Sequence, residues 1–197
     1  MAIFDLSLSP KNAKKEQERV LVKLLRKAKN TAFGKAYNFD QILMSNEPAV
    51  AFKKNVPLFN YNKIYKEWWV KSLEGETDVC WPGKIQYYAL SSGTSEAASK
   101  YIPVTKELLA GNKTIMVKQL LTLMHYKNVP HSSIAKGWLT IGGSTDLQKG
   151  DGYYAGDLSG ITAKKAPIWF RPFYKPGKKI AKERDWHKKL EEIVEKA

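Results

Sequence analysis

The sequence has one cysteine, no long apolar run and fewer acidic than basic residues, and each shortage excludes a class of protein. Cys80 alone can form neither an internal disulfide nor a cysteine-rich zinc site. No run of about 18 apolar residues exists, so no segment predicts a membrane-spanning helix. The start of the chain, MAIFDLSLSPKNAKK, lacks the basic and apolar regions of a secretory signal. A cytoplasmic protein with no membrane partner is the simplest interpretation.

The excess of positive charge lies at the two ends of the chain. The net charge is +14, of which residues 11–35 contribute +7 and residues 161–197 contribute +6, so the middle is nearly neutral. Basic ends are one signal of nucleic-acid binding. Two other interpretations stay open, namely solvated helix faces and acidic partners within a larger chain. We favour solvated faces, since charge reports on solubility more than on fold, and do not expect a nucleic-acid partner.

The first half of the chain predicts helices. Hydrophobic residues make up 43% of the sequence, enough for a packed core. Ser9 and Pro10 are typical of a helix start, and apolar residues then recur at helical spacing until the helix ends before Gly34. Residues 31–40 predict turns. Shorter helices are expected over residues 41–44, 49–54 and 60–73.

The second half alternates strands with helices, which indicates a layered α/β core. Strands are expected over 85–90 and 101–104, and Thr105 is expected to cap a long apolar helix that reaches His125. A buried strand is expected over 137–143 and irregular structure over 153–161. Residues 178–196 predict one amphipathic helix that packs through Leu190, Ile193 and Val194.

The polar segment SSGTSEAASKYIPVT, residues 91–105, follows the first expected strand directly. Glycine lets the backbone N–H groups of a turn approach a phosphate, while hydroxyls add donors and a lysine adds charge. The segment lacks the second glycine and the Gly-Lys pair of the pattern G-x-x-x-x-G-K-[ST]. By composition alone, an ordinary polar turn remains the alternative.

Together with motifs elsewhere in the chain, this segment resembles the phosphate loop of the adenylate-forming enzymes. More narrowly, it resembles the plant auxin-responsive acyl acid–amido synthetases and their bacterial-type relatives, whose loop runs approximately S-S-G-T-[ST]-x-G-x-x-K-x-x-P-x-T. The resemblance covers nearly all 197 residues. Its other motifs, in chain order, are Leu24-Leu25, Thr31-Ala32-Phe33-Gly34, Val56-Pro57 with Tyr61, Gly75-Glu76, Trp81-Pro82-Gly83 and RPFYKPGKK.

The resemblance implies an α/β fold, the partial N-terminal domain of an adenylate-forming enzyme, with helices packed on an incomplete sheet. Its members use ATP and Mg²⁺ to convert a carboxylic acid to an acyl-adenylate, which gives the carboxylate a good leaving group. They then transfer the acyl group to an amino acid. The residues that match the ATP phosphate loop are Ser91, Ser92, Gly93, Thr94, Ser95 and Lys100. The residues expected to line the acyl-acid pocket are Leu109, Asn112, Ile115 and Met116.

Two departures from the family pattern limit this expectation. Ala97 stands where members commonly have a second glycine, and its Cβ disfavours positive φ. Relatives are also much longer, with adenine-binding elements and a mobile C-terminal domain after the region matched here. We therefore expect residues 1–197 to be an incomplete N-terminal domain with little complete turnover, prone to self-association through uncovered surface. A non-catalytic remnant or a basic binding module is the alternative.

The remaining candidate sites are weaker. The spacing of His125 and His131 around Pro130 does not match a helical metal pair, and no metal site is expected. The aromatic pairs 68–69, 87–88 and 153–154 suit core packing better than base stacking. The turn 142–145 is interpreted as a strand exit more than as an anion site. Surface solvation is the preferred interpretation for Arg171 and Lys175.

Overall fold

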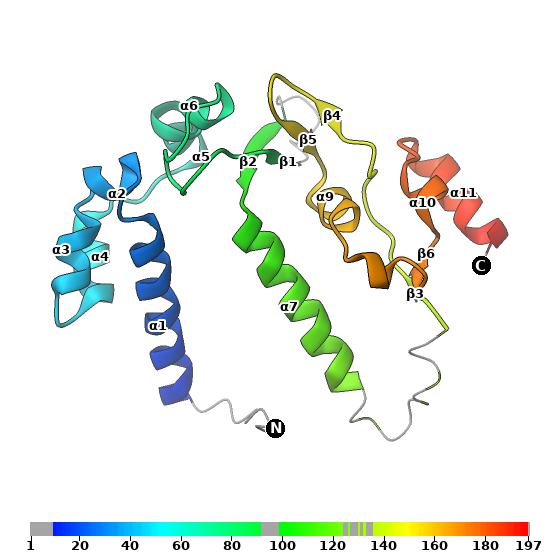
Figure 1. Ribbon diagram of the computed structural model, residues 1–197, viewed down its shortest axis with the longest axis horizontal. Coiled ribbons are helices and arrows are strands. Elements are labelled where there is room, and N and C mark those ends of the chain that lie inside the picture. Colours follow the sequence, from blue (N-terminus) through cyan, green and yellow to red (C-terminus); the bar gives the residue numbers. More distant parts are fainter. Residues whose placement is uncertain are drawn as a thin grey trace. The chain divides into compact units, whose positions relative to one another are not determined.

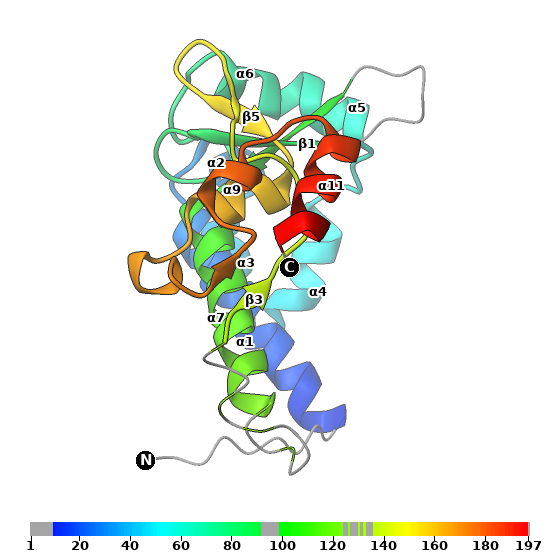
Figure 2. The same cartoon turned by 90° about the vertical axis from the view of Figure 1, so that its right-hand side faces the viewer.

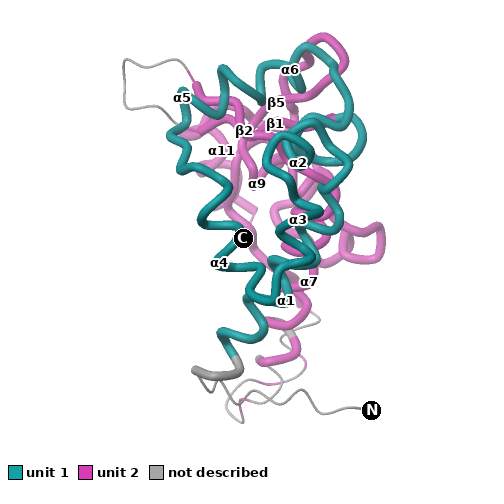
Figure 3. Tube along the Cα trace, turned by 90° about the vertical axis from the view of Figure 1, so that its left-hand side faces the viewer, with its two compact units in different colours: residues 1–84 teal, residues 85–197 magenta. Residues whose placement is uncertain are grey.

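The computed structural model describes residues 10–91, 99–123, 126, 130, 132 and 136–196. The chain divides into two compact units, residues 1–84 and 85–197, coloured teal and magenta in Figure 3. Among the helices of the described residues, none has the length and apolar character needed to cross a bilayer. The mixture of helices with small sheets confirms the expected α/β class.

The regular structure in the described part of unit 1 is helical, and it ends at Leu73 (Figure 1). Its core consists of Leu25 and Ala28 from the first helix with Phe39 and Ile42 from the third, all buried. Burial of this apolar stripe explains why a helix rich in lysine packs at all. The elements are α1 (Pro10–Ala28), α2 (Ala32–Ala36), α3 (Phe39–Met44), α4 (Pro48–Asn55), α5 (Tyr61–Ile64), the π-helix η1 (Tyr65–Trp69) and α6 (Val70–Leu73).

The connection between α1 and α2 is held by a buried threonine. The Thr31 hydroxyl donates to the Ala28 carbonyl at 2.7 Å and accepts from the Gly34 N–H at 3.0 Å. The next N–H groups, of residues 32 and 33, donate to the carbonyls of Asp78 and Val79. The expectation of turns over residues 31–40 is therefore wrong, because a helix cap and contacts from a distant segment stabilise α2 there.

Unit 2 contains a four-stranded mixed sheet in the order β2-β1-β5-β4. Strands β1 (Tyr87–Ser91) and β2 (Lys100–Val104) are antiparallel, while β1 runs parallel to β5 (Tyr154–Gly156). Strand β4 (Gln148–Lys149) pairs with β5 in the antiparallel sense. A second sheet joins β3 (Trp138–Leu139) to β6 (Tyr174–Lys175).

The helices of unit 2 include α7 and α9, which pack their buried residues against the larger sheet. The core cluster joins Ala89 and Val104 from the strands to Leu109 from α7, Ile161 from α9 and Leu147 from the segment before β4. Figure 2 labels α9 and α11, which both belong to unit 2. The helices are α7 (Lys106–Leu123), α9 (Leu158–Lys164), the 3-10 helix η2 (Ile168–Phe170), α10 (Lys178–Ala181) and α11 (Trp186–Lys196).

Three expectations for unit 2 are wrong. Residues 153–161 are regular, since they form β5 and begin α9. The strand expected over 137–143 is only β3, and both Leu139 and Ile141 are more than half exposed. The final helix is two helices, because the Glu183 carboxylate accepts the backbone N–H groups of the next two residues and so stabilises a break. Val194 is exposed, while Ile193 is buried as expected.

Candidate functional site

The candidate site is built on the hairpin formed by β1 and β2. Five cross-strand pairs run from Tyr87↔Val104 to Ser91↔Lys100. Ser91, the first residue of the polar segment singled out in the sequence, is therefore directly paired with Lys100 of the same segment. Ser91 is half-buried and Lys100 is exposed. The other residues predicted to bind phosphate, Ser92, Gly93, Thr94 and Ser95, lie outside the described residues, as does Ala97.

The strand alternation decides which side of the sheet Ser91 and Lys100 share. Side chains along a strand alternate between faces, and directly paired residues lie on the same face. Ala89 lies two positions before Ser91, and Val104 lies four positions after Lys100. Both are buried in the cluster with Leu109 of α7. Ser91 and Lys100 therefore lie on the face of the sheet that carries this buried cluster, to which Leu109 of α7 and Ile161 of α9 both belong. A hydroxyl and an ammonium group are thus brought together on the helix-bearing side.

Helix α7 follows β2 after a single residue, which caps it. The Thr105 hydroxyl accepts the Leu108 N–H at 3.0 Å, as the sequence predicted. A cap one residue after the strand fixes where the helix begins relative to the hairpin. The N-terminal turn of α7 follows directly from the strand that carries Lys100.

The residues predicted to line an acyl-acid pocket occupy different environments along α7. Leu109 is 8% exposed and belongs to the core, where it contributes to packing. Asn112 and Met116 are half-buried, and Ile115 is 56% exposed. Their role in an acyl-acid pocket stays a prediction.

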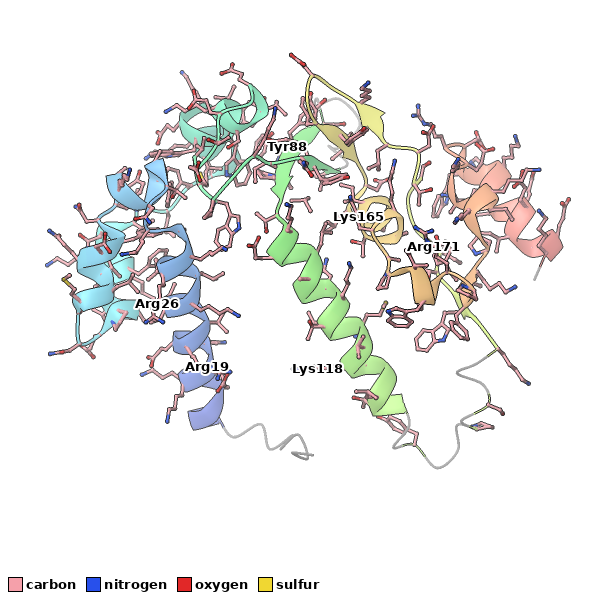
Figure 4. The ribbon with its side chains drawn as sticks, viewed as in Figure 1. Arg19, Arg26, Tyr88, Lys118, Lys165 and Arg171 are labelled. Carbon is pink, nitrogen blue, oxygen red and sulfur yellow. The ribbon has the colours of Figure 1, made fainter. Side chains whose placement is uncertain are left out.

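The two tyrosine pairs considered above for base stacking, 87–88 and 153–154, pack against each other. Tyr87 and Tyr154, paired across β1 and β5, stack with ring centroids 5.8 Å apart. Tyr88, labelled in Figure 4, meets Tyr153 edge-on at 5.3 Å. The Lys165 ammonium, also labelled, lies 4.7 Å from the Tyr87 ring centroid. These contacts favour the interpretation as core packing. The signal in the sequence was that each of the two segments carries two adjacent tyrosines, whose side chains point to opposite faces of a strand.

The turn at residues 142–145 uses its polar groups within the protein. The Gly143 N–H donates to the Ser159 hydroxyl at 2.9 Å. The Ser144 hydroxyl donates to the Lys182 carbonyl at 2.7 Å, and the Lys189 ammonium donates to the Gly142 carbonyl at 3.0 Å. Burial lowers the pKa of Lys189. These bonds join the turn to α9, to the residue that follows α10 and to α11, so its polar groups have partners within the protein. The interpretation as a strand exit is wrong, because β3 already ends at Leu139.

Metal ligands do not gather in the part of the chain that the structure describes. No group of three histidine, cysteine, aspartate or glutamate side chains there is arranged to hold an ion. His125 and His131 lie outside the described residues, and His187 is exposed. Arg171 and Lys175 are exposed as well.

The comparisons with known proteins identify the family. A family model described as the GH3 family N-terminal domain matches residues 3–191, and the chain belongs to this family. The match confirms the resemblance to acyl acid–amido synthetases on which the sequence expectations rest. A comparison with curated proteins found no match.

Two solved structures share the fold. The structure titled "GH3.15 acyl acid amido synthetase" is 21% identical and superposes with a TM-score of 0.66 over 91% of this chain and 30% of its own. The structure titled "AtGH3.15 acyl acid amido synthetase in complex with 2,4-DB" is 24% identical, with a TM-score of 0.58 over 78% of this chain and 26% of its own. The chain thus spans less than a third of the length of these similar proteins.

Proposed function

We propose that this chain supplies the phosphate-binding hairpin and the first acyl-facing helix of an ATP-dependent acyl acid–amido synthetase. In that reaction a carboxylate oxygen attacks the α-phosphorus of ATP, and the bond to pyrophosphate breaks. The amine of an amino acid then attacks the acyl carbon and displaces AMP, with loss of a proton. This proposal rests on family membership and on the hairpin geometry.

The observation that carries the proposal is the pairing of Ser91 with Lys100. An ammonium group and a hydroxyl on one face suit a multiply charged phosphate, since charge-assisted hydrogen bonds are the strongest ones available to a side chain. The segment between them carries the further hydroxyls and the glycine that match the family's loop. On adenylation, negative charge moves onto pyrophosphate, and a fixed cation nearby stabilises that change.

Magnesium belongs to this proposal as a companion of the nucleotide. Mg²⁺ keeps several waters and is usually held by one or two carboxylates together with substrate phosphates. It would supply charge neutralisation at the phosphates. The described residues contribute the Lys100 ammonium and the Ser91 hydroxyl to the same task.

Isothermal titration with MgATP tests the proposal at the level of binding. We expect wild-type protein to bind MgATP and the substitution Lys100→Ala to weaken binding about tenfold or more, as befits loss of a charged hydrogen bond. Ser92→Ala, chosen from the sequence pattern, should weaken it as well. Lys149→Ala is the matched control, because Lys149 is an exposed lysine on β4 of the same sheet.

Equal affinity of Lys100→Ala, Ser92→Ala and the wild type for MgATP would contradict the proposal. If the same protein instead bound nucleic acid with a steep salt dependence, the chain would be the basic binding module that its charged ends suggest. The proposal also includes a carboxylic acid and an amino acid as substrates and the complete conversion of the two to an amide. Adenylation and transfer assays on the protein with each substrate class would test them.

A further inference from the structure

Unit 1 contains an open apolar cavity that shares no residue with the hairpin or with α7. Its volume is about 860 Å³, within the range of about 300–1,000 Å³ typical of small-molecule sites. Leu21 and Leu24 of α1 form one wall, and Phe33, Phe52 and Trp81 form others. These elements all lie in the teal unit of Figure 3.

The Phe33 wall of the cavity is held in place by ring contacts and by a backbone hydrogen bond. The Phe33 ring meets the Trp68 ring edge-on at 5.0 Å and the Phe39 ring at 5.9 Å. Its backbone N–H donates to the Val79 carbonyl at 2.8 Å. A wall fixed by both ring packing and a backbone bond is preformed, so a ligand would not have to order it.

The cavity opens to solvent along an apolar rim. Leu24 is 46% exposed and Leu58 is 98% exposed, although both line it. Removing such side chains from water is favourable, so the rim favours an apolar occupant.

The only charged side chains among the described residues that line the cavity are Lys53 and Lys54. Both lie in the last turn of α4 and both are exposed. Cations there also favour the helix C-terminus. However, no carboxylate lines the cavity to balance them, so the net charge of its lining is positive. An occupant complementary to this cavity has an apolar body and one anionic head group.

We propose that this cavity binds a single amphipathic carboxylate molecule taken up from solution. Its apolar body would lie against α1, Phe33 and Trp81, and its carboxylate would contact Lys53 and Lys54. The site goes beyond the proposed synthetase function, because it involves neither Ser91, Lys100 nor the helix after them. No covalent step is involved.

Binding can be measured by titration with decanoate and dodecanoate below their micellar concentrations, with 1-decanol as the uncharged probe. We expect affinity to rise about fourfold for each added methylene, as burial of a CH₂ group predicts. The double substitution Lys53→Gln with Lys54→Gln should weaken decanoate about tenfold and leave 1-decanol unchanged. Lys66→Gln, at an exposed lysine of η1 outside the cavity, is the matched control.

Cys80 provides a second readout, because it lines the cavity and is the only cysteine of the chain. Saturating dodecanoate should slow its alkylation by N-ethylmaleimide at least tenfold. Leu24→Glu should abolish both this protection and decanoate binding. The half-exposed position of Leu24 means that the folded state should survive, which circular dichroism checks.

Three results would overturn the proposal. The first is unchanged decanoate affinity in the double lysine variant. The second is binding to vesicles of anionic phospholipid as tight as the binding of decanoate, which would mean that this surface contacts a membrane. The third is a concentration-dependent dimer in sedimentation that Leu24→Glu dissociates, which would make a second copy the occupant. Lys100→Ala should leave decanoate binding intact, so failure here and failure of the synthetase proposal are distinguishable.

Discussion

The substitution Thr31→Val tests how the wall of the unit 1 cavity is held. Thr31 is 1% exposed, and its hydroxyl both donates to the Ala28 carbonyl and accepts from the Gly34 N–H. Valine has nearly the same shape without the hydroxyl. The change therefore removes two buried hydrogen bonds with little change in packing.

The two lost bonds have unequal consequences. The Ala28 carbonyl keeps a donor, since the Thr31 N–H also reaches it at 3.0 Å, so that loss costs about 1 kcal/mol. The Gly34 N–H is buried and loses the acceptor that caps α2, at about 1–3 kcal/mol. The added methyl group offsets up to about 1 kcal/mol. A net loss of about 2 kcal/mol is a large part of the roughly 5–15 kcal/mol that stabilises a domain.

Urea unfolding followed by tryptophan fluorescence and circular dichroism gives the free energy of unfolding. Thr31→Ser keeps the hydroxyl and should cost less than Thr31→Val. Thr114→Val, at an exposed helical threonine that bonds the Ala110 carbonyl, should change stability by less than about 0.5 kcal/mol. If Thr31→Val were as stable as the wild type, or no less stable than Thr31→Ser, the hydroxyl would not hold this turn.

Three further predictions concern reactivity, close packing and pH. Burial raises the pKa of Cys80 from 9.0 to about 12, so the thiolate fraction at pH 8 is about 1,000-fold lower than that of an exposed thiol. A thiolate of higher pKa is also more nucleophilic, which offsets part of this loss, so alkylation should be about 50-fold slower than for an exposed thiol. Gly160→Ala should destabilise unit 2 by more than about 2 kcal/mol, because a Cβ there would overlap a main-chain carbonyl. Gly111→Ala in α7, where a Cβ meets nothing, should stabilise by up to about 1 kcal/mol in the same urea assay. The pKa of Glu183 lies below its usual value, chiefly because the Asp185 N–H donates to its carboxylate. Its contribution is complete above the unfolded-state pKa and is lost as pH falls through the lower folded-state pKa, so Glu183→Gln should reduce the acid-side slope of stability against pH.

Each of these predictions has an outcome that contradicts it. Alkylation of Cys80 at the rate of a free thiol would mean that the thiol is not buried. Equal stability of Gly160→Ala and Gly111→Ala would remove the argument from close approach. An unchanged acid limb in Glu183→Gln would mean that its carboxylate does not stabilise the break before α11.

Much of the helical architecture could be predicted because it depends on local pattern. Helices α1 and α4 occur close to their expected positions, since apolar spacing, proline and terminal residues act within a few positions along the chain. The cap of α7 was predicted from Thr105 alone. Strands β1 and β2 were also found within two residues of their expected bounds.

The elements that were missed depend on contacts between distant residues. Strand β5 lies in a glycine-rich segment whose local signal favours irregular structure, but it pairs in parallel with β1. A pairing between segments so far apart in the chain cannot be predicted from the pattern of a few neighbouring residues. Helix α2 was missed for the same reason, since its first N–H groups bond to Asp78 and Val79.

The sequence by itself determined the residue types by which the family is recognised. Hydroxyls and a glycine follow β1, and Lys100 begins β2, in an order that resembles the family's loop, and the family model matches residues 3–191. Only the tertiary structure decided that Ser91 and Lys100 are directly paired on the face that carries the buried cluster of unit 2, because register depends on the partner strand. It alone also gathered Leu24, Phe33 and Lys53 around one cavity, since packing brings together residues that no local pattern relates.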